Sequence, residues 1–233
     1  IELSKDEGII TITNPDSVSI LDIQKRKIIN TFKKPFVEAS ITDAAISNDS
    51  RKIAIAVNSD NNIDSIYVLE KSLDWDVVTN YTLTDTTLNY SYFNIDWSVD
   101  DKFIITTSRY KTSRFLELWD YATKKKIFKI FNPHNVNISD ISVSPIENLI
   151  VTIDLNSNIK VWELTNNLDI YNFEEKYNFL TNSFLNNSIV WSPDASRFAV
   201  GTTGKPIDKL LAVYAVKTYP ETEDISDSVF SIV

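Results

Sequence analysis

The chain has 233 residues, 43% of them hydrophobic and 24% charged, which is ordinary for a globular protein of one or two domains. It contains no cysteine, which excludes disulfides, thiolate nucleophiles and cysteine-bound zinc, and no apolar run approaches the roughly 18 residues that cross a bilayer. The formal net charge of −9 argues against a phosphate-neutralising surface, so nucleic acid is not expected as the main direct ligand.

A serine-centred pattern repeats along the whole chain. Each serine directly follows an apolar residue, and in most copies an acidic residue comes two positions later. The serines are Ser4, Ser47, Ser98, Ser144, Ser192 and Ser231. They stand 43, 51, 46, 48 and 39 residues apart, a spacing that suits four short antiparallel strands per unit.

Two further strands are predicted after each serine turn. The first is a nearly continuous β-branched run, typical of a strand covered on both faces, and it recurs at 9–12, 53–57, 103–105, 149–151 and 198–200. The second closes each unit at 18–22, 66–70, 116–120, 159–163 and 211–215. A polar turn and a weaker fourth strand follow, as at 126–131.

These units predict an all-β fold, a β-propeller. A lone four-stranded sheet with two apolar faces is not stable in water, whereas radial stacking of such sheets buries both faces of each. We expect residues 1–233 to form a single propeller domain, or the major part of one. Five blades are complete in the sequence, and 225–231 begin a sixth.

Three short motifs resemble the WD-repeat family. They are Leu118-Trp119-Asp120, Val161-Trp162-Glu163 and the turn Trp191-Ser192-Pro193-Asp194. The resemblance implies a larger ring, commonly of seven blades, that presents rigid loops to partners.

The resemblance also implies a buried hydrogen-bonded chain in the fourth unit. Carried over by position, its members are His134, Asp154, Asn156 and Trp162, with Pro133 in place of the usual glycine. The family places a serine or threonine and an acid where Asp154 and Asn156 stand, so the chain of bonds departs from the usual pattern.

The sequence shows no catalytic constellation, so we expect no enzymatic activity, no cofactor and no metal. His134 is the only histidine, and its position in the repeat already accounts for it as a structural residue. Residues 60–64 carry the first ligand positions of a calcium loop but lack its glycine and its bidentate glutamate, so a polar hairpin explains them better.

Aromatic residues are the first partner-binding candidates. Tyr177, Phe179 and Phe184 lie in a predicted connection over 174–184, where they either anchor a partner or fold back over the blade edges. Trp75 is either an exposed anchor or a packed edge residue.

A polar column four residues before each serine is the second candidate. We expect it to line the mouth of the central channel, which is either solvated or open to a basic tail of a partner. Its members are Asp43, Asn94, Asp140, Ser188 and Asp227.

The leading functional hypothesis is a non-enzymatic protein-interaction scaffold. The chain would serve as one subunit of a larger intracellular multiprotein complex, in the cytoplasm or nucleus of a eukaryotic cell, without membrane insertion. Two alternatives stay open: a propeller of an RNA- or translation-associated factor, and a regulatory propeller attached to a hydrolase.

Overall fold

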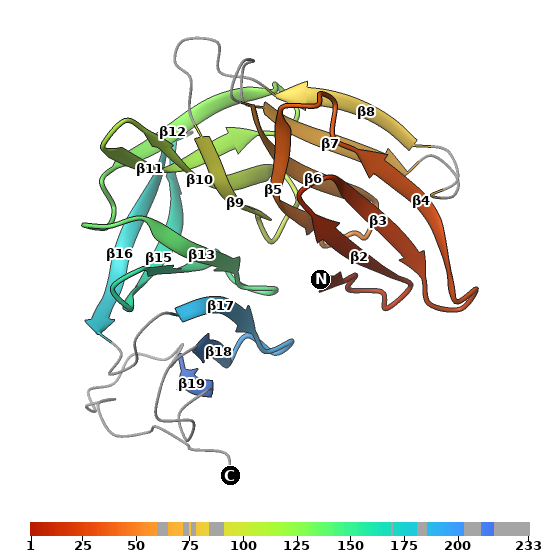
Figure 1. Cartoon of the computed structure of the whole chain (residues 1–233). Helices are drawn as coiled ribbons and strands as arrows, with labels where there is room; N and C mark the ends of the chain where they lie inside the picture. Colours follow the sequence, from red (N-terminus) through yellow and green to blue (C-terminus); the bar gives the residue numbers. More distant parts are fainter. Residues whose placement is uncertain are drawn as a thin grey trace. The chain divides into compact units, whose positions relative to one another are not determined.

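The computed structural model describes residues 1–59, 65–71, 75, 78–83, 91–168, 170–180, 186–202 and 211–216. All the regular secondary structure in these residues is β-strand, as Figure 1 shows. The chain divides into two compact units, 1–133 and 134–233, which are described separately.

The first unit contains three antiparallel four-stranded sheets, here called blades one to three. Blade one comprises β1 (Glu2–Leu3), β2 (Ile9–Asn14), β3 (Ser17–Asp22) and β4 (Lys27–Lys33). Blade two comprises β5 (Ala39–Ile46), β6 (Lys52–Ser59), β7 (Ser65–Lys71) and β8 (Val78–Leu83). Blade three comprises β9 (Ser91–Trp97), β10 (Phe103–Tyr110), β11 (Ser113–Asp120) and β12 (Lys125–Phe131).

The second unit contains blades four and five. Blade four comprises β13 (Ile138–Val143), β14 (Leu149–Asp154), β15 (Asn158–Asn167) and β16 (Ile170–Leu180). Blade five comprises β17 (Asn186–Trp191), β18 (Arg197–Thr202) and β19 (Leu211–Ala215). The fourth strand predicted for blade five and the start of a sixth at 225–231 lie outside the described residues.

The fold class is confirmed, as are the predicted strands among the described residues: the chain is an all-β propeller, and within each unit neighbouring blades pack face to face. Apolar residues of blades two and three form one cluster around Trp97 and Trp119, and blades one and two share another around Ile53. Blades four and five share a third cluster, which includes Val161 and Trp191. The continuous apolar runs are the second strands, and those of blades two, three and four are buried on both faces as expected. In blades one and five, buried and half-buried residues alternate along this strand.

The serine repeat is a tight turn between the first two strands of each blade. In four blades the serine hydroxyl donates to the acid two residues on, at 2.6–2.8 Å, and accepts the backbone N–H five residues on, at 2.9–3.1 Å. The residue three after the serine has a positive φ of 55–57°, although none is glycine; these residues are Glu7, Ser50, Asp101 and Ala195. The side-chain hydrogen bonds therefore stabilise a conformation that non-glycine residues adopt rarely.

The connection predicted over 174–184 is wrong for most of its length. Residues up to Leu180 continue β16, which pairs with β15 along its whole length. The polar residues of this segment suggested a loop, but they lie on an outer strand whose exposed face tolerates them.

Candidate functional site

The polar column binds neighbouring blades to one another. Asp43 of β5 accepts the N–H of Ala44 at 2.9 Å with one oxygen, and with the other it accepts the N–H of Ile95 on the next blade at 3.0 Å. Asp140 of β13 makes the same pair of bonds, to Ile141 at 2.9 Å and to Ile189 of blade five at 2.6 Å. The strand register shifts directly before each acid, and such bulges re-aim side chains.

A tryptophan returns a second bond across each of these two interfaces. The indole N–H of Trp97 donates to the carbonyl of Ala45 at 3.1 Å, and that of Trp191 donates to the carbonyl of Ser142 at 3.0 Å. Each acid and tryptophan pair thus joins two inner strands by bonds that run in opposite directions. We call this arrangement the inner-strand clasp.

Burial perturbs the acids of the first unit. It raises the pKa of Asp43 to about 6, against the lowering effect of the N–H groups of Ile95 and Ala44. Glu2 accepts the N–H of Ile46 at 2.8 Å, and burial together with the charges of Asp96 and Asp43 raises its pKa well above the ordinary value. These two buried acids therefore hold their protons more tightly than ordinary carboxyls do, and a nearby cationic group would favour their ionisation.

Asn94, the corresponding residue of β9, makes a side-chain bond within its own blade. Its side-chain oxygen accepts the hydroxyl of Thr107 at 2.8 Å. Ser188 is exposed, and Asp227 lies outside the described residues.

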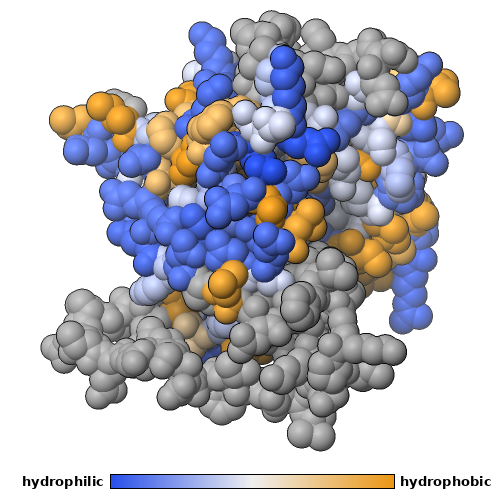
Figure 2. Space-filling model, turned by 60° about the vertical axis from the view of Figure 1, so that its left-hand side comes forward, coloured by the Kyte–Doolittle hydropathy of each residue, from blue (hydrophilic) through white to orange (hydrophobic). Residues whose placement is uncertain are grey.

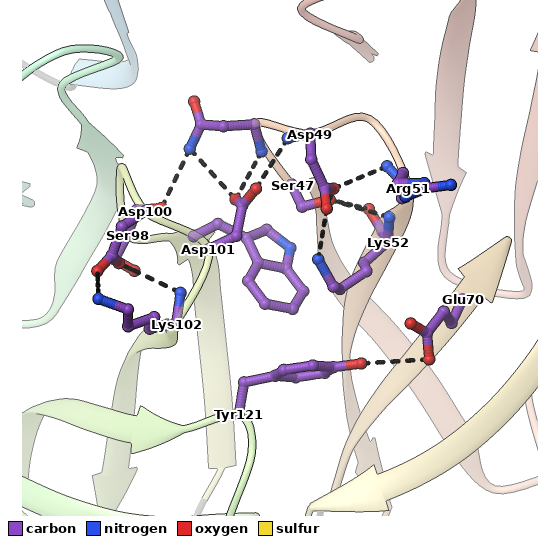
Figure 3. Close-up of polar contacts among 12 residues, drawn as sticks. Ser47, Asp49, Arg51, Lys52, Glu70, Ser98, Asp100, Asp101, Lys102 and Tyr121 are labelled. Carbon is purple, nitrogen blue, oxygen red and sulfur yellow. Dashed lines mark hydrogen bonds and ion pairs between the residues drawn. The ribbon is translucent and has the colours of Figure 1, made fainter.

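At the serine turns, a further contact joins blades two and three, which Figure 3 shows. Asp101 accepts the backbone N–H groups of Asn48 at 2.7 Å and Asp49 at 2.8 Å, and the side-chain amide of Asn48 donates to the carbonyl of Ser98 at 3.1 Å. We call this arrangement the turn clasp. It places the aspartate charge on two amides of the neighbouring turn.

A lysine fills the space beside the turn clasp. The Nζ atom of Lys52 lies 5.6 Å from the centre of the Trp97 ring and 5.5 Å from that of Tyr121, and 2.8 Å from a carboxylate oxygen of Asp49. The Tyr121 hydroxyl donates to Glu70 at 3.4 Å, and burial, with the nearby charge of Glu70, raises the tyrosine pKa. The ammonium group of Lys52 thus already interacts with the aromatic rings and the carboxylate at this place.

The hydrogen-bonded chain in blade four connects four side chains. The ring nitrogens of His134 lie 3.0 Å from Asp154 Oδ2 and 2.7 Å from Thr152 Oγ1, and the indole of Trp162 donates to the same hydroxyl at 2.9 Å. Burial acts to raise the Asp154 pKa, but the bonds from His134 and from backbone N–H groups lower it below its ordinary value. The carboxylate accepts from Nδ1–H, and the Thr152 hydroxyl bonds the other ring nitrogen.

Sequence reasoning missed Thr152 and assigned its role wrongly. Asp154 was expected at the serine or threonine position and Asn156 at the acid position, whereas Thr152 and Asp154 occupy them. Asn156 contributes its backbone N–H, which donates to Asp154 at 2.9 Å. The predicted positions are displaced by two residues along the chain. Because side chains two residues apart in a strand point to the same face of the sheet, the displacement left the predicted face unchanged.

The order Asp154–His134–Thr152 resembles a catalytic triad in its connectivity. Thr152 is 0% exposed and His134 2%, and the hydroxyl already accepts the indole N–H. A substrate does not reach this hydroxyl, so its role is structural.

The aromatic candidates fall in different environments. Tyr177 is 44% exposed on β16, which makes it accessible to a partner. Trp75 is 1% exposed in the core that blades one and two share, so the packed alternative holds for it. The side chain of Phe179 and the whole of Phe184 lie outside the described residues, as does the hairpin over 60–64.

Neither a metal centre nor a membrane span is found in the part of the chain that the structure describes. No group of three or more His, Cys, Asp or Glu residues there could hold a metal ion. No helix there is long and apolar enough to cross a bilayer.

One protein family matches part of the chain. Residues 125–163 match the WD domain, G-beta repeat, and they run from β12 through most of β15, including the His134 chain. No curated protein matches the chain.

Proposed function

We propose that this β-propeller, in which 125–163 match a WD repeat, acts as a non-enzymatic protein-interaction scaffold of the WD-repeat family in a larger intracellular multiprotein complex. Propellers of this family generally bind other proteins.

The observation that supports the proposal is that buried polar side chains form hydrogen bonds within and between the blades. The only histidine is enclosed in the blade-four hydrogen-bonded chain, and Asp43 and Asp140 each hold two backbone amides. Such a frame presents loops and strand edges with little loss of conformational entropy on binding, which favours affinity.

Two parts of this frame are proposed partner contacts. Tyr177 offers a half-exposed aromatic ring of the kind that anchors interfaces. The inner-strand acids of the first unit would attract a basic tail, since burial and mutual repulsion oppose their ionisation until a cation arrives.

Quantitative co-purification from the native cells tests the proposal. Tagged wild-type protein should recover a reproducible set of partners, and it should elute with them in size-exclusion chromatography. Elution of the native protein as a free monomer would contradict the scaffold role.

Two variants separate the proposed contacts from the frame. Tyr177→Ser should lower partner recovery, whereas Leu168→Ser, which removes another exposed apolar residue, should not. Asp43→Asn removes the charge but keeps one acceptor, so it should release a basic tail while circular dichroism stays unchanged. Full recovery of every partner with both Tyr177→Ser and Asp43→Asn would exclude these residues as contacts.

A further inference from the structure

One face of blade one carries an aliphatic row that is only partly covered. The row consists of four residues, each opposite the next in the strand register: Leu3, Ile10, Leu21 and Ile28. It therefore crosses all four strands of the blade. Leu3 is 53% exposed and Ile28 54%, and the two residues between them are half-buried. We call this row the open face of blade one.

The equivalent residues of the next two blades are buried. Counted from the serine and along the strand register, they are Ile46, Ile53 and Leu69 in blade two and Trp97, Ile104 and Trp119 in blade three. All six are 0–6% exposed, because they pack against the blade that precedes them in the chain. The open face of blade one thus has the composition of a surface that contacts another blade.

Such a row is unusual on this molecule. In Figure 2 the hydrophobic residues on the drawn side appear mostly in small groups among hydrophilic ones. An exposed apolar surface that crosses a whole sheet is typical of an interaction site.

Blade five has an open face of the opposite kind. In blade two, the residues that contact the following blade are small or aliphatic and 0–3% exposed: Ala45, Ala54, Ala56 and Val68. Their equivalents in blade five are Val190, Ala199, Gly201 and Val213. Val190 is 59% exposed, and the other three are half-buried. We call these four residues the open face of blade five.

Side-chain size matches the two open faces to each other. Between blades two and three the small Ala45 meets the large Trp97, whose indole N–H donates to the Ala45 carbonyl at 3.1 Å. Blade five has the larger Val190 at the position of Ala45, and blade one has the smaller Leu3 at the position of Trp97. Because packed interfaces leave little empty space, the larger side chain on one face compensates for the smaller one on the other.

The charged residues of the serine turns also correspond. In the turn clasp, Asp101 of blade three meets a turn of blade two that carries Asp49 and Lys52. The equivalents are Glu7 of blade one and Asp194 and Arg197 of blade five. The interfaces between blades one and two and between blades four and five lack an acid at the position of Asp101. Pro193, which has no N–H, replaces Asn48, so Glu7 would accept one backbone amide instead of two.

We propose that a second copy of this chain covers these surfaces: the open face of blade five in one copy docks on the open face of blade one in another. The contact would repeat the packing seen between neighbouring blades and would bury Leu3 and Val190. Because two different surfaces meet, the association is head to tail, and it either closes into a ring or extends by further copies. This inference goes beyond the scaffold function, since it concerns copies of the chain itself.

Sedimentation velocity of the full chain over a concentration series tests the proposal. The weight-average mass should rise with concentration from one chain toward two or more. Leu3→Glu and Val190→Glu should each weaken self-association by about a hundred-fold or more, because each places a charge in an apolar contact. Leu3→Ser, a milder change, should weaken it in the same direction. Val37→Glu alters an 84%-exposed valine that lies on neither open face, so it should leave the mass unchanged.

A mixture of the two glutamate variants tests the head-to-tail geometry. The Leu3→Glu chain keeps an intact open face on blade five, and the Val190→Glu chain keeps one on blade one. Each variant alone should be monomeric, whereas the mixture should form a complex of two chains. It should form nothing larger, because both faces left over in that complex carry a glutamate.

Three outcomes would overturn the inference: a wild type that stays monomeric at every concentration, full self-association of either glutamate variant, or no complex in the mixture. A monomeric wild type whose unfolding midpoint falls in both glutamate variants would show that the chain covers its own open faces. For blade five the cover would then be the strand predicted at 225–231, which lies outside the described residues. Co-purification with other proteins tests the scaffold function separately, so the two proposals fail independently.

Discussion

The interface between blades two and three and the interface between blades four and five share one device and differ in another. Both contain the inner-strand clasp, with an aspartate on the neighbouring amide and an indole on the neighbouring carbonyl. Between blades two and three, Asn58 adds two bonds, both of 2.7 Å, to the backbone of Tyr92. The inner-strand clasp is therefore the common connection between neighbouring blades, and the Asn58 bonds add to the stability of the interface between blades two and three.

The turn clasp shows the difference most clearly. In blade five the position of Asp101 is taken by Ala195, which has no carboxylate, and in blade four the position of Asn48 is taken by Pro145, which has no N–H. The acceptor and one of its two backbone donors are therefore replaced together, and the other donor position, Ile146, gives its N–H to Ser144 at 3.4 Å. A single replacement would have left a polar group without its partner, which is the costly arrangement.

The largest expected effect is the loss of an inner-strand acid. Asp140→Ala leaves the N–H groups of Ile141 and Ile189 without their acceptor, and unfolding free energy should fall by about 2–4 kcal/mol. Asp43→Ala should cost less, about 1–3 kcal/mol, because it also removes a carboxylate whose burial is unfavourable.

Urea unfolding of both variants at neutral pH measures this difference. The denaturant slope should stay near the wild-type value, since the exposed surface on unfolding is unchanged. A larger loss of unfolding free energy for Asp43→Ala than for Asp140→Ala would contradict this order. It would show that the interface between blades two and three depends on Asp43 despite the added Asn58 bonds.

The second effect tests the turn clasp by exchange. Asp101→Ala should lower unfolding free energy by about 1–2 kcal/mol, because the amides of Asn48 and Asp49 lose a charged acceptor. Ala195→Asp should also destabilise, although an aspartate suits a positive φ, since Ala195 is buried and Pro145 donates nothing. Stabilisation by Ala195→Asp in thermal unfolding would show that another donor reaches this position.

The third effect is on pH dependence. The folded pKa of Asp43, about 6, lies above its ordinary value, so the folded state holds the proton more tightly. This contribution to stability is present below the unfolded pKa and is lost as the pH rises through 6. From pH 4.5 to 7.5, Asp43→Asn should therefore gain on the wild type by about 2 kcal/mol.

Urea unfolding at the two pH values checks this gain, with Asp16→Asn as the control for removal of an exposed carboxyl. A difference between wild type and Asp43→Asn that stays constant with pH would mean that Asp43 titrates as an ordinary aspartate.

Much of this architecture could be predicted from the sequence. The serine repeat and the apolar runs fixed strand order and the blade assignments, because turn chemistry and burial of both faces leave local signals at regular spacing. The wrong connection over 174–184 has a different cause: the polar residues of β16 lie on an exposed outer strand and resemble a loop in composition.

The contacts between blades could not be predicted from spacing alone. The polar column was recognised, but its bonds to Ile95 and Ile189 depend on a register shift that has no sequence signature. Thr152 was missed because a shift of two residues preserves the strand face.

The smallest expected effect concerns Lys52, the cation beside the turn clasp. Lys52→Met keeps the apolar stem against Trp97 and Tyr121 but removes the charge, so unfolding free energy should fall by about 0.5–1 kcal/mol. Arg197 occupies the equivalent position in blade five and is exposed, so Arg197→Met should change stability by less than about 0.5 kcal/mol. The Lys52 effect should persist at high salt because its side chain is only 12% exposed, and buried pairs are screened little. Equal effects at both positions, or an effect of Lys52→Met that high salt removes, would show that the rings of Trp97 and Tyr121 do not add to the contribution of Lys52.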